Sequence, residues 1–255
     1  MQIPVPKRNL CVFIAATACY FLVLNSSWYA KGQKVEGTQT QTPVARIDPG
    51  LAYRMHKGSN RRVLLPRLTQ FPDAEAMRTA NGDLGRQQSN LSARASGCLA
   101  GNKKHSFWEQ RTRVAVLTRD VLSIDSKASV YCGGPHPDVE YFPLTYSMRT
   151  GKQFDFNRDA ALIFIAGRLP SAELMKLYVR QYSTELRDCK PSAIFDSFGN
   201  GSNFGIFLHF ERDGLAITPD LPHVIAGCGP QEVVPYQELS PLLKEDNPFR
   251  SLTNK

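Results

Sequence analysis

At 255 residues the chain is long enough for one large domain or two small ones. Its formal net charge is +8, and the basic excess is concentrated in residues 31–110, which hold 13 Lys/Arg and 6 Asp/Glu. None of the six cysteines forms a CxxC pair, which argues against a zinc ribbon or a thioredoxin-like site. We therefore expect no metal site and no cofactor.

Residues 1–30 have the pattern of an export segment. Lys7 and Arg8 precede an uncharged apolar run over residues 10–24, which is about as long as a signal-peptide core and shorter than the roughly 20 residues of a comfortable membrane span. A cleaved signal peptide, an uncleaved membrane anchor over residues 10–29 and a lipid on Cys19 all stay open. Each alternative places the rest of the chain in the periplasm or another extracytoplasmic space.

The four cysteines behind this segment are Cys98, Cys132, Cys189 and Cys228. An even number in an oxidising compartment predicts two disulfides, with three possible pairings. The basic region next to the export segment suits an anionic lipid or wall polymer better than nucleic acid. The alternative interpretation of this charge is a solvated linker and helix face.

Residues 31–59 are rich in Gly, Gln and Thr and show no sustained period, which predicts a flexible basic tether. Order is expected to begin near Arg61, in a single domain over residues 60–255. After Pro72 and Asp73, a seven-residue apolar recurrence predicts a first helix with one buried stripe; its members are Met77, Leu84 and Leu91.

β-type stretches follow over residues 112–118, 121–125 and 129–132, as in an antiparallel meander. A hairpin is predicted across Arg149-Thr150-Gly151, because the glycine accepts positive φ. A second helix is expected over residues 171–187, since apolar residues recur at helical spacing; they are Met175, Tyr178, Val179, Tyr182 and Leu186.

The clearest strand pattern covers residues 202–210, where aromatic and aliphatic side chains alternate. Asp213-Gly214 predicts a hairpin turn into residues 215–218, because both residues tolerate the left-handed region. A strand at residues 233–234 and a short helix at 237–244 complete the chain. The expected fold class is α+β, with an antiparallel sheet of hairpins packed on two main helices and linked by disulfides.

Catalytic motifs are absent from the sequence, which contains no HExxH, GxSxG or Walker A pattern. In the string Tyr131-Cys132-Gly133-Gly134-Pro135-His136-Pro137-Asp138, glycines and prolines force a loop that holds His136 near Asp138. This pair fits a base with its orienting carboxylate or a sugar-binding site, and the alternative is a rigid turn whose side chains bond nearby backbone.

Aromatic residues predict either a binding platform or a packed core; they are Phe107, Trp108, Tyr131, Tyr141 and Phe142. The candidate binding residues are Trp108, Tyr131, His136 and Asp138. For His209 and His223, in or near predicted strands, packing inside the fold is the expected role.

Three segments carry a family resemblance: LSIDSKASVYCGGPHPD, LTYSMRTGKQFDF and FERDGLAITPDLPHVIAGCGPQEVVPYQEL. In this order they resemble the extracellular domain of unknown function typified by the C-terminal part of the anti-sigma factor RsiV, which also precedes the catalytic domain of some peptidoglycan deacetylases. The resemblance covers roughly residues 61–245. It implies an α+β domain with Cys98 paired to Cys132 and Cys189 paired to Cys228.

These patterns together predict an exported, non-catalytic binding module. The expected partners are a cell-wall glycan, such as a peptidoglycan fragment, or a secreted protein such as lysozyme. The resemblance does not predict sigma-factor control, because only nine residues precede the apolar run. The alternative function is a cell-wall hydrolase that uses His136 and Asp138.

Overall fold

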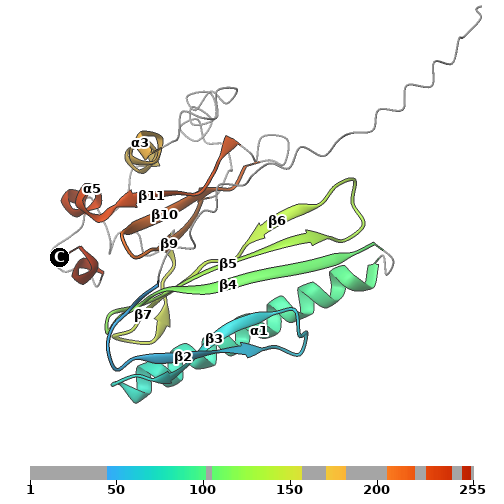
Figure 1. Cartoon of the computed structure of the whole chain (residues 1–255), viewed down its shortest axis with the longest axis horizontal. Coiled ribbons are helices and arrows are strands. Elements are labelled where there is room, and N and C mark those ends of the chain that lie inside the picture. The colour runs from blue at the N-terminus through green and yellow to red at the C-terminus, as the bar shows by residue number, and fades with distance from the viewer. Residues whose placement is uncertain are drawn as a thin grey trace, which may run out of the picture. The chain divides into compact units, whose positions relative to one another are not determined.

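The computed structural model of the protein describes residues 45–101, 105–156, 171–181, 206–221, 228–242 and 249–253 (Figure 1). All of them belong to one unit, Thr42–Lys255. The predicted α+β class is confirmed, although the strands form three separate sheets instead of one. Among the described residues, no helix is long and apolar enough to cross a membrane.

The largest sheet has six strands. They are β1 (Arg46–Ile47), β4 (Phe107–Leu117), β5 (Val121–Tyr131), β6 (Asp138–Tyr141), β7 (Leu144–Ser147) and β8 (Lys152–Gln153). The strand order is β1-β4-β5-β7-β8, and β6 pairs with the far end of β5. All neighbours are antiparallel except β1, which runs parallel to β4.

A two-stranded hairpin of β2 (Ala52–Lys57) and β3 (Leu64–Gln70) precedes the first helix. The predicted tether over residues 31–59 is therefore wrong for residues 45–59, which include β1 and β2. Within this segment Leu51 is buried in the hydrophobic core and Tyr53 packs against it. The segment is also ordered because β1 pairs with β4 and β2 pairs with β3, so that its backbone groups find hydrogen-bond partners.

Helix α1 (Ala74–Gly101) begins as predicted after Pro72 and Asp73. The Asp73 carboxylate accepts hydrogen bonds from the backbone N–H groups of Glu75 and Ala76, both at 2.9 Å, and so caps the helix. The helix contacts β3, β4 and β8, and Figure 1 shows it with β2 and β3 on one face of the six-stranded sheet.

The first hydrophobic core lies between α1, the hairpin and this sheet. The buried stripe of α1 contains Leu84 and Leu91 as predicted, together with Ala80, Ala95 and Cys98. Met77, which was predicted in the stripe, is only partly buried at the edge of the core. Small residues on the stripe let the helix approach the strands closely.

The C-terminal part contains a three-stranded sheet in the order β11-β10-β9. Its strands are β9 (Ile206–Phe210), β10 (Gly214–Pro219) and β11 (Glu232–Pro235); its helices are α3 (Ser171–Gln181), α5 (Tyr236–Leu239) and the 3-10 turns η3 (Ser240–Leu242) and η4 (Arg250–Leu252). These elements form a second core. Strand β9 contacts β5 and β7, so the two sheets meet on the face opposite α1 (Figure 1).

Two local predictions in this part need correction. Val179 was placed on the buried face of the second helix, but it is 37% exposed. The described buried residues of α3 are Leu174, Leu177 and Tyr178, of which Tyr178 was predicted; the side chain of Met175 and the residues Tyr182 and Leu186 lie outside the described part of the chain. The turn before β10 exists, yet Gly214 is needed for another reason: a Cβ there would overlap the Val234 carbonyl.

The predicted hairpin at residues 149–151 is confirmed. Gly151 adopts φ +69° between β7 and β8, and its amide donates to the Ser147 carbonyl at 2.8 Å. Of the stretches predicted after α1, residues 112–118 belong to β4, while 121–125 and 129–132, predicted as separate stretches, fall in or at the end of the single strand β5; β4 and β5 each run for 11 residues. Pairing between two long antiparallel partners extends the strands beyond the local apolar pattern.

Cys98 and Cys132 form a disulfide, so this predicted pairing is confirmed. Cys98 lies inside α1, near its end. The bond ties the C-terminal turn of α1 to the residue after β5. Cys228 is also disulfide-bonded; Cys189 lies outside the described residues, and its pairing with Cys228 stays a prediction.

Candidate functional site

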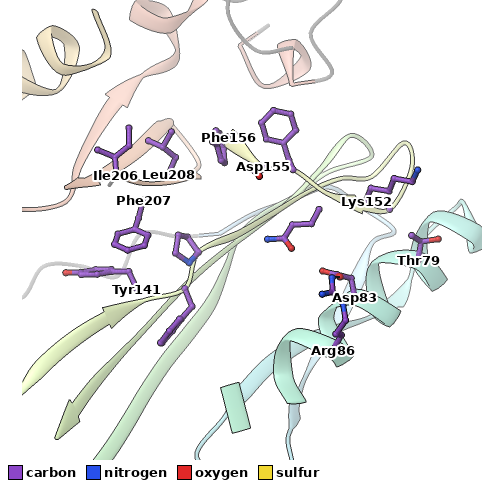
Figure 2. A pocket seen from close by; sticks show the side chains of 15 residues that line it. Thr79, Asp83, Arg86, Tyr141, Lys152, Asp155, Phe156, Ile206, Phe207 and Leu208 are labelled. Atoms are coloured by element: carbon purple, nitrogen blue, oxygen red, sulfur yellow. Dashed lines mark hydrogen bonds and ion pairs between the residues drawn. The ribbon is translucent and has the colours of Figure 1, made fainter. Parts of the chain in front are cut away.

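A cleft of about 550 Å³ lies between α1, the six-stranded sheet and β9. Residues 79, 83 and 86 of α1 form one wall, and residues 206–208 of β9 with Tyr141 form the other (Figure 2). Residues 142–143 and 151–156 complete the lining. The volume falls within the range of small-molecule sites, about 300–1,000 Å³.

The α1 wall is polar. Thr79, Asp83 and Arg86 recur at helical spacing and share one face of the helix. Arg86 donates to Asp83 Oδ1, and the Tyr146 hydroxyl donates to Asp83 Oδ2 at 2.8 Å. Two donors thus fix the orientation of the Asp83 carboxylate at the cleft.

Tyr146 is fully buried beneath this wall. Burial, and then the charge and hydrogen bond of Asp83, raise the pKa of Tyr146 far above its ordinary value. The hydroxyl therefore stays protonated as a donor to Asp83 at every physiological pH. The carboxylate keeps acceptor capacity for a ligand, because an ionised carboxylate offers about four lone-pair sites.

The opposite wall is aromatic. The rings of Tyr141 and Phe207 stack with centroids 5.5 Å apart and planes 28° apart. Figure 2 shows these two rings on the β9 side of the pocket, with the Tyr141 hydroxyl directed away from the α1 side chains. Burial and then the carboxylates of Asp125 and Asp138 raise the pKa of Tyr141, so its ring carries no charge at neutral pH.

The end of the cleft depends on close backbone packing. Gly151 lies against α1, and a Cβ at this position would overlap the carbonyl group of Ala76. Gln153 of β8 accepts a hydrogen bond from Gln87 of α1 at 3.0 Å. The β7–β8 hairpin is thereby held against the helix, which closes the cleft at this end.

None of the predicted binding residues lines the cleft. Trp108 lies in the first core with 2% of its surface exposed, and its ring stacks on Phe142 at 5.9 Å. Tyr131 is half-buried at the end of β5, where it stacks on Phe107. The residues of the predicted aromatic platform therefore lie on opposite faces of the sheet and do not form one surface.

His136 lies in the loop before β6 and Asp138 is the first residue of β6; both are exposed. His136 Nδ1 lies 3.2 Å from the Pro137 carbonyl oxygen. Asp138 Oδ1 accepts from the Val139 amide at 2.7 Å. Each side chain thus contacts adjacent backbone, as in the rigid-turn alternative, and the loop stands apart from the residues that line the cleft.

The sequence analysis missed a charged cluster at the junction of the two sheets. Arg113 of β4 donates to both carboxylate oxygens of Glu211 and contacts Asp125 Oδ2 through Nε at 3.2 Å. His209 Nε2 lies 2.9 Å from Glu211 Oε1. His209 is buried, which confirms its expected packing, and His223 lies outside the described residues.

Potential metal-ligand atoms of Asp125, His209 and Glu211 all lie within 4.8 Å of one another. The Arg113 guanidinium already contacts both carboxylates, so a cation there would meet a competing positive charge. Burial alone raises the pKa of Glu211, but the hydrogen bonds and charges of His209 and Arg113 outweigh it and lower this pKa. The arrangement is that of a structural ion-pair network.

The cleft and the charged cluster both join segments that are far apart in the sequence. Asp83 and Phe207 face the same cavity, and Arg113 and Glu211 are separated by 98 positions. The helical spacing of Thr79, Asp83 and Arg86 was a possible signal for the first wall. No local pattern connects that wall to β9.

No family model matches the sequence, and no curated protein matches it. The fold is similar to the crystal structure of a DUF3298 family protein from Pseudomonas aeruginosa PAO1, with a TM-score of 0.46 and 12% identity, over 77% of this chain and 93% of that one. It is also similar to a DUF3298 family member from Bacteroides fragilis NCTC 9343, with a TM-score of 0.43 and 12% identity, over 80% and 95% of the two chains. The resemblance to RsiV and to deacetylase modules stays a prediction.

Proposed function

We propose that the chain is an exported, non-catalytic module whose cleft binds a saccharide fragment of the cell wall. The observation that carries this proposal is the pairing of opposite walls in one cleft. The stacked rings of Tyr141 and Phe207 line the same cleft as the ion pair of Asp83 and Arg86.

Each wall suits one side of a sugar. A pyranose ring has a face of C–H groups that packs on an aromatic ring, whose π face is negative. Its hydroxyl groups require oriented acceptors and donors, which Asp83 and Arg86 supply. A guanidinium carries five N–H donors, of which the bond to Asp83 uses one.

The extracytoplasmic location rests on the export pattern of residues 1–30 and on the disulfides. Disulfides persist in oxidising compartments and are rare in the cytosol. Saccharide fragments of the cell wall are available in the same compartment, so the location and the chemistry of the cleft agree.

The test is calorimetric titration of the purified, oxidised protein with muropeptides, with chitooligosaccharides and with lysozyme as separate ligands. We expect a saccharide to bind, and Asp83→Asn or Tyr141→Ala to weaken its binding at least tenfold. Arg86→Gln should also weaken it, whereas Arg78→Gln, an exposed arginine of α1 outside the cleft, should not. Binding of lysozyme without any saccharide would contradict the proposal and identify a protein partner.

A further inference from the structure

The part of the six-stranded sheet beyond the β9 contact has a second surface, which shares only Tyr141 with the cleft. Side chains on β4 and β5 alternate between two faces. Trp108, Ala128 and Val130 point into the first core. The outer face carries the other residues of these strands and of β6: Phe107, Glu109, Arg111, Lys127, Ser129, Tyr131, Val139 and Tyr141.

Apolar side chains form one end of the outer face. Phe107 and Tyr131 are cross-strand partners whose rings stack with centroids 6.2 Å apart. Val139, which pairs with Ser129 on the next rung, is 46% exposed. A contiguous group of this kind is informative, whereas single exposed apolar residues are ordinary.

Two positive charges stand directly opposite each other on the same face. Arg111 of β4 pairs in register with Lys127 of β5, and both are exposed. Like charges in this position destabilise a sheet. No ion pair joins either of them to a described residue.

The charged residues next to this pair on β4 are Arg113 and Glu109. Arg113, two residues along β4, contacts the carboxylates of both Asp125 and Glu211, so these two negative charges outnumber its single positive charge. Glu109 on the other side lies opposite Ser129 and supplies one negative charge. Arg111 and Lys127 therefore exceed Glu109 by one positive charge, next to the half-buried rings of Phe107 and Tyr131.

We propose that the outer face binds a polysaccharide chain that carries carboxylate groups. Phe107 and Tyr131 would pack on the C–H faces of the sugars, while Arg111 and Lys127 would bind the carboxylates. Arginine forms bidentate hydrogen bonds with carboxylates, and lysine acts as a point charge. This ligand relieves the repulsion between the two cations, which a neutral sugar does not.

The size of the face favours a glycan chain over a folded protein. Three strands are about 14 Å wide, and four residues along β4 span about 13 Å, so the face covers about 200 Å². A stable protein partner commonly buries about 800 Å² on each side. An extended sugar chain can occupy a narrow strip along the strands. This proposal does not depend on the cleft.

The test compares oligogalacturonate with its methyl ester, which keeps the rings and removes the charges. Calorimetric titration of the full oxidised protein should show binding of the acid, at least tenfold weaker binding of the ester, and weaker binding of the acid in high salt. The variant Arg111→Gln/Lys127→Gln should lose at least tenfold in affinity. Its melting temperature should be equal or higher because the like-charge pair is removed.

The control Arg61→Gln/Arg62→Gln removes the same charge from exposed residues between β2 and β3, and Asp83→Asn alters the cleft alone. Both should bind oligogalacturonate as the unmodified protein does. Equal losses in the Arg61/Arg62 variant would show non-specific attraction and overturn the proposal. It would also be overturned by equal binding of the ester, by no binding at millimolar concentration, or by an acidic protein that binds at Arg111 and Lys127 when oligogalacturonate does not.

Discussion

Arg113 and Glu211 form a two-point ion pair between β4 and the residue that follows β9, 98 positions later in the chain. The Glu211 side chain is 5% exposed and that of Arg113 is 23% exposed. The Tyr236 hydroxyl also donates to the Glu211 carbonyl at 2.7 Å. This pair therefore links the six-stranded sheet to the three-stranded sheet at a site that is largely shielded from water.

Arg113→Met is expected to lower the free energy of unfolding by about 3–5 kcal/mol, because it leaves the buried Glu211 carboxylate without its partner. Urea denaturation measures this change. The double variant Arg113→Met/Glu211→Gln should lose less than the two single variants added together, since the two side chains interact. Strict additivity would show that the pair contributes no coupling.

Stability is expected to fall in acid because the pKa of Glu211 is lower in the folded protein than its ordinary value of 4.5. A depressed folded pKa contributes stability that is fully present above the unfolded pKa and is lost as the pH falls through the folded pKa. The same sign applies to Asp120, whose pKa is lowered, against the effect of burial, by its bonds to Ser251 and Arg149. Urea midpoints measured from pH 6 to pH 2.5 should decline below about pH 4.5, and less steeply in Glu211→Gln.

Removing the Cys98–Cys132 disulfide in Cys98→Ala/Cys132→Ala should cost about 3–4 kcal/mol in the chain-entropy model, because the closed loop spans 34 positions. Thermal and urea unfolding of the oxidised protein and of this variant measure the difference. Reduction of the unmodified protein serves as the companion experiment. An unchanged unfolding midpoint in the variant would contradict the expectation.

Substitution by alanine is expected to lower the stability of the protein at Gly214 and to raise it at Gly82. In Gly214→Ala the new Cβ would overlap the Val234 carbonyl and push β10 and β11 apart, with an expected loss of about 1–3 kcal/mol. Gly82→Ala meets no atom within 4 Å on the exposed face of α1 and should gain about 0.5–1 kcal/mol from helix propensity. Melting temperatures of the two variants decide both signs.

Tyr146→Phe removes the hydroxyl that orients Asp83 without changing the lining of the cleft. We expect severalfold weaker saccharide binding, because Asp83 then depends on Arg86 alone for its orientation. Calorimetric titration measures the affinity, and near-ultraviolet circular dichroism checks that the core stays packed. Unchanged affinity would show that the carboxylate needs no second donor.

Local chemistry was enough to predict much of the first half of the domain. Asp73 caps α1 because its carboxylate can reach the first free amides of the helix, and Gly151 forms the hairpin because it accepts positive φ. The α+β class followed from alternating apolar patterns. Such features depend on residues that are close in sequence, so local sequence patterns are enough to predict them.

Other features depended on partners that are distant in the sequence. Residues 46–47 form a strand only because β4 lies beside them. Side chains along β4 alternate between the two faces of the sheet, and Trp108 is buried because it lies on the face that α1 covers. The same alternation places Arg111 on the opposite, exposed face, where it lies beside Lys127. Local patterns could not indicate which face each residue occupies, because register and the face covered by α1 are set by pairing across the whole sheet.

By itself, the sequence determined the helix start at Asp73, the hairpin at Gly151 and the alternation that makes an α+β domain. Only the tertiary structure decided that Asp83 and Arg86 line one cleft together with Tyr141 and Phe207. The physical reason is that a helix or strand defines its own periodicity through adjacent residues, whereas a binding site is formed by side chains that meet only after the whole core has packed.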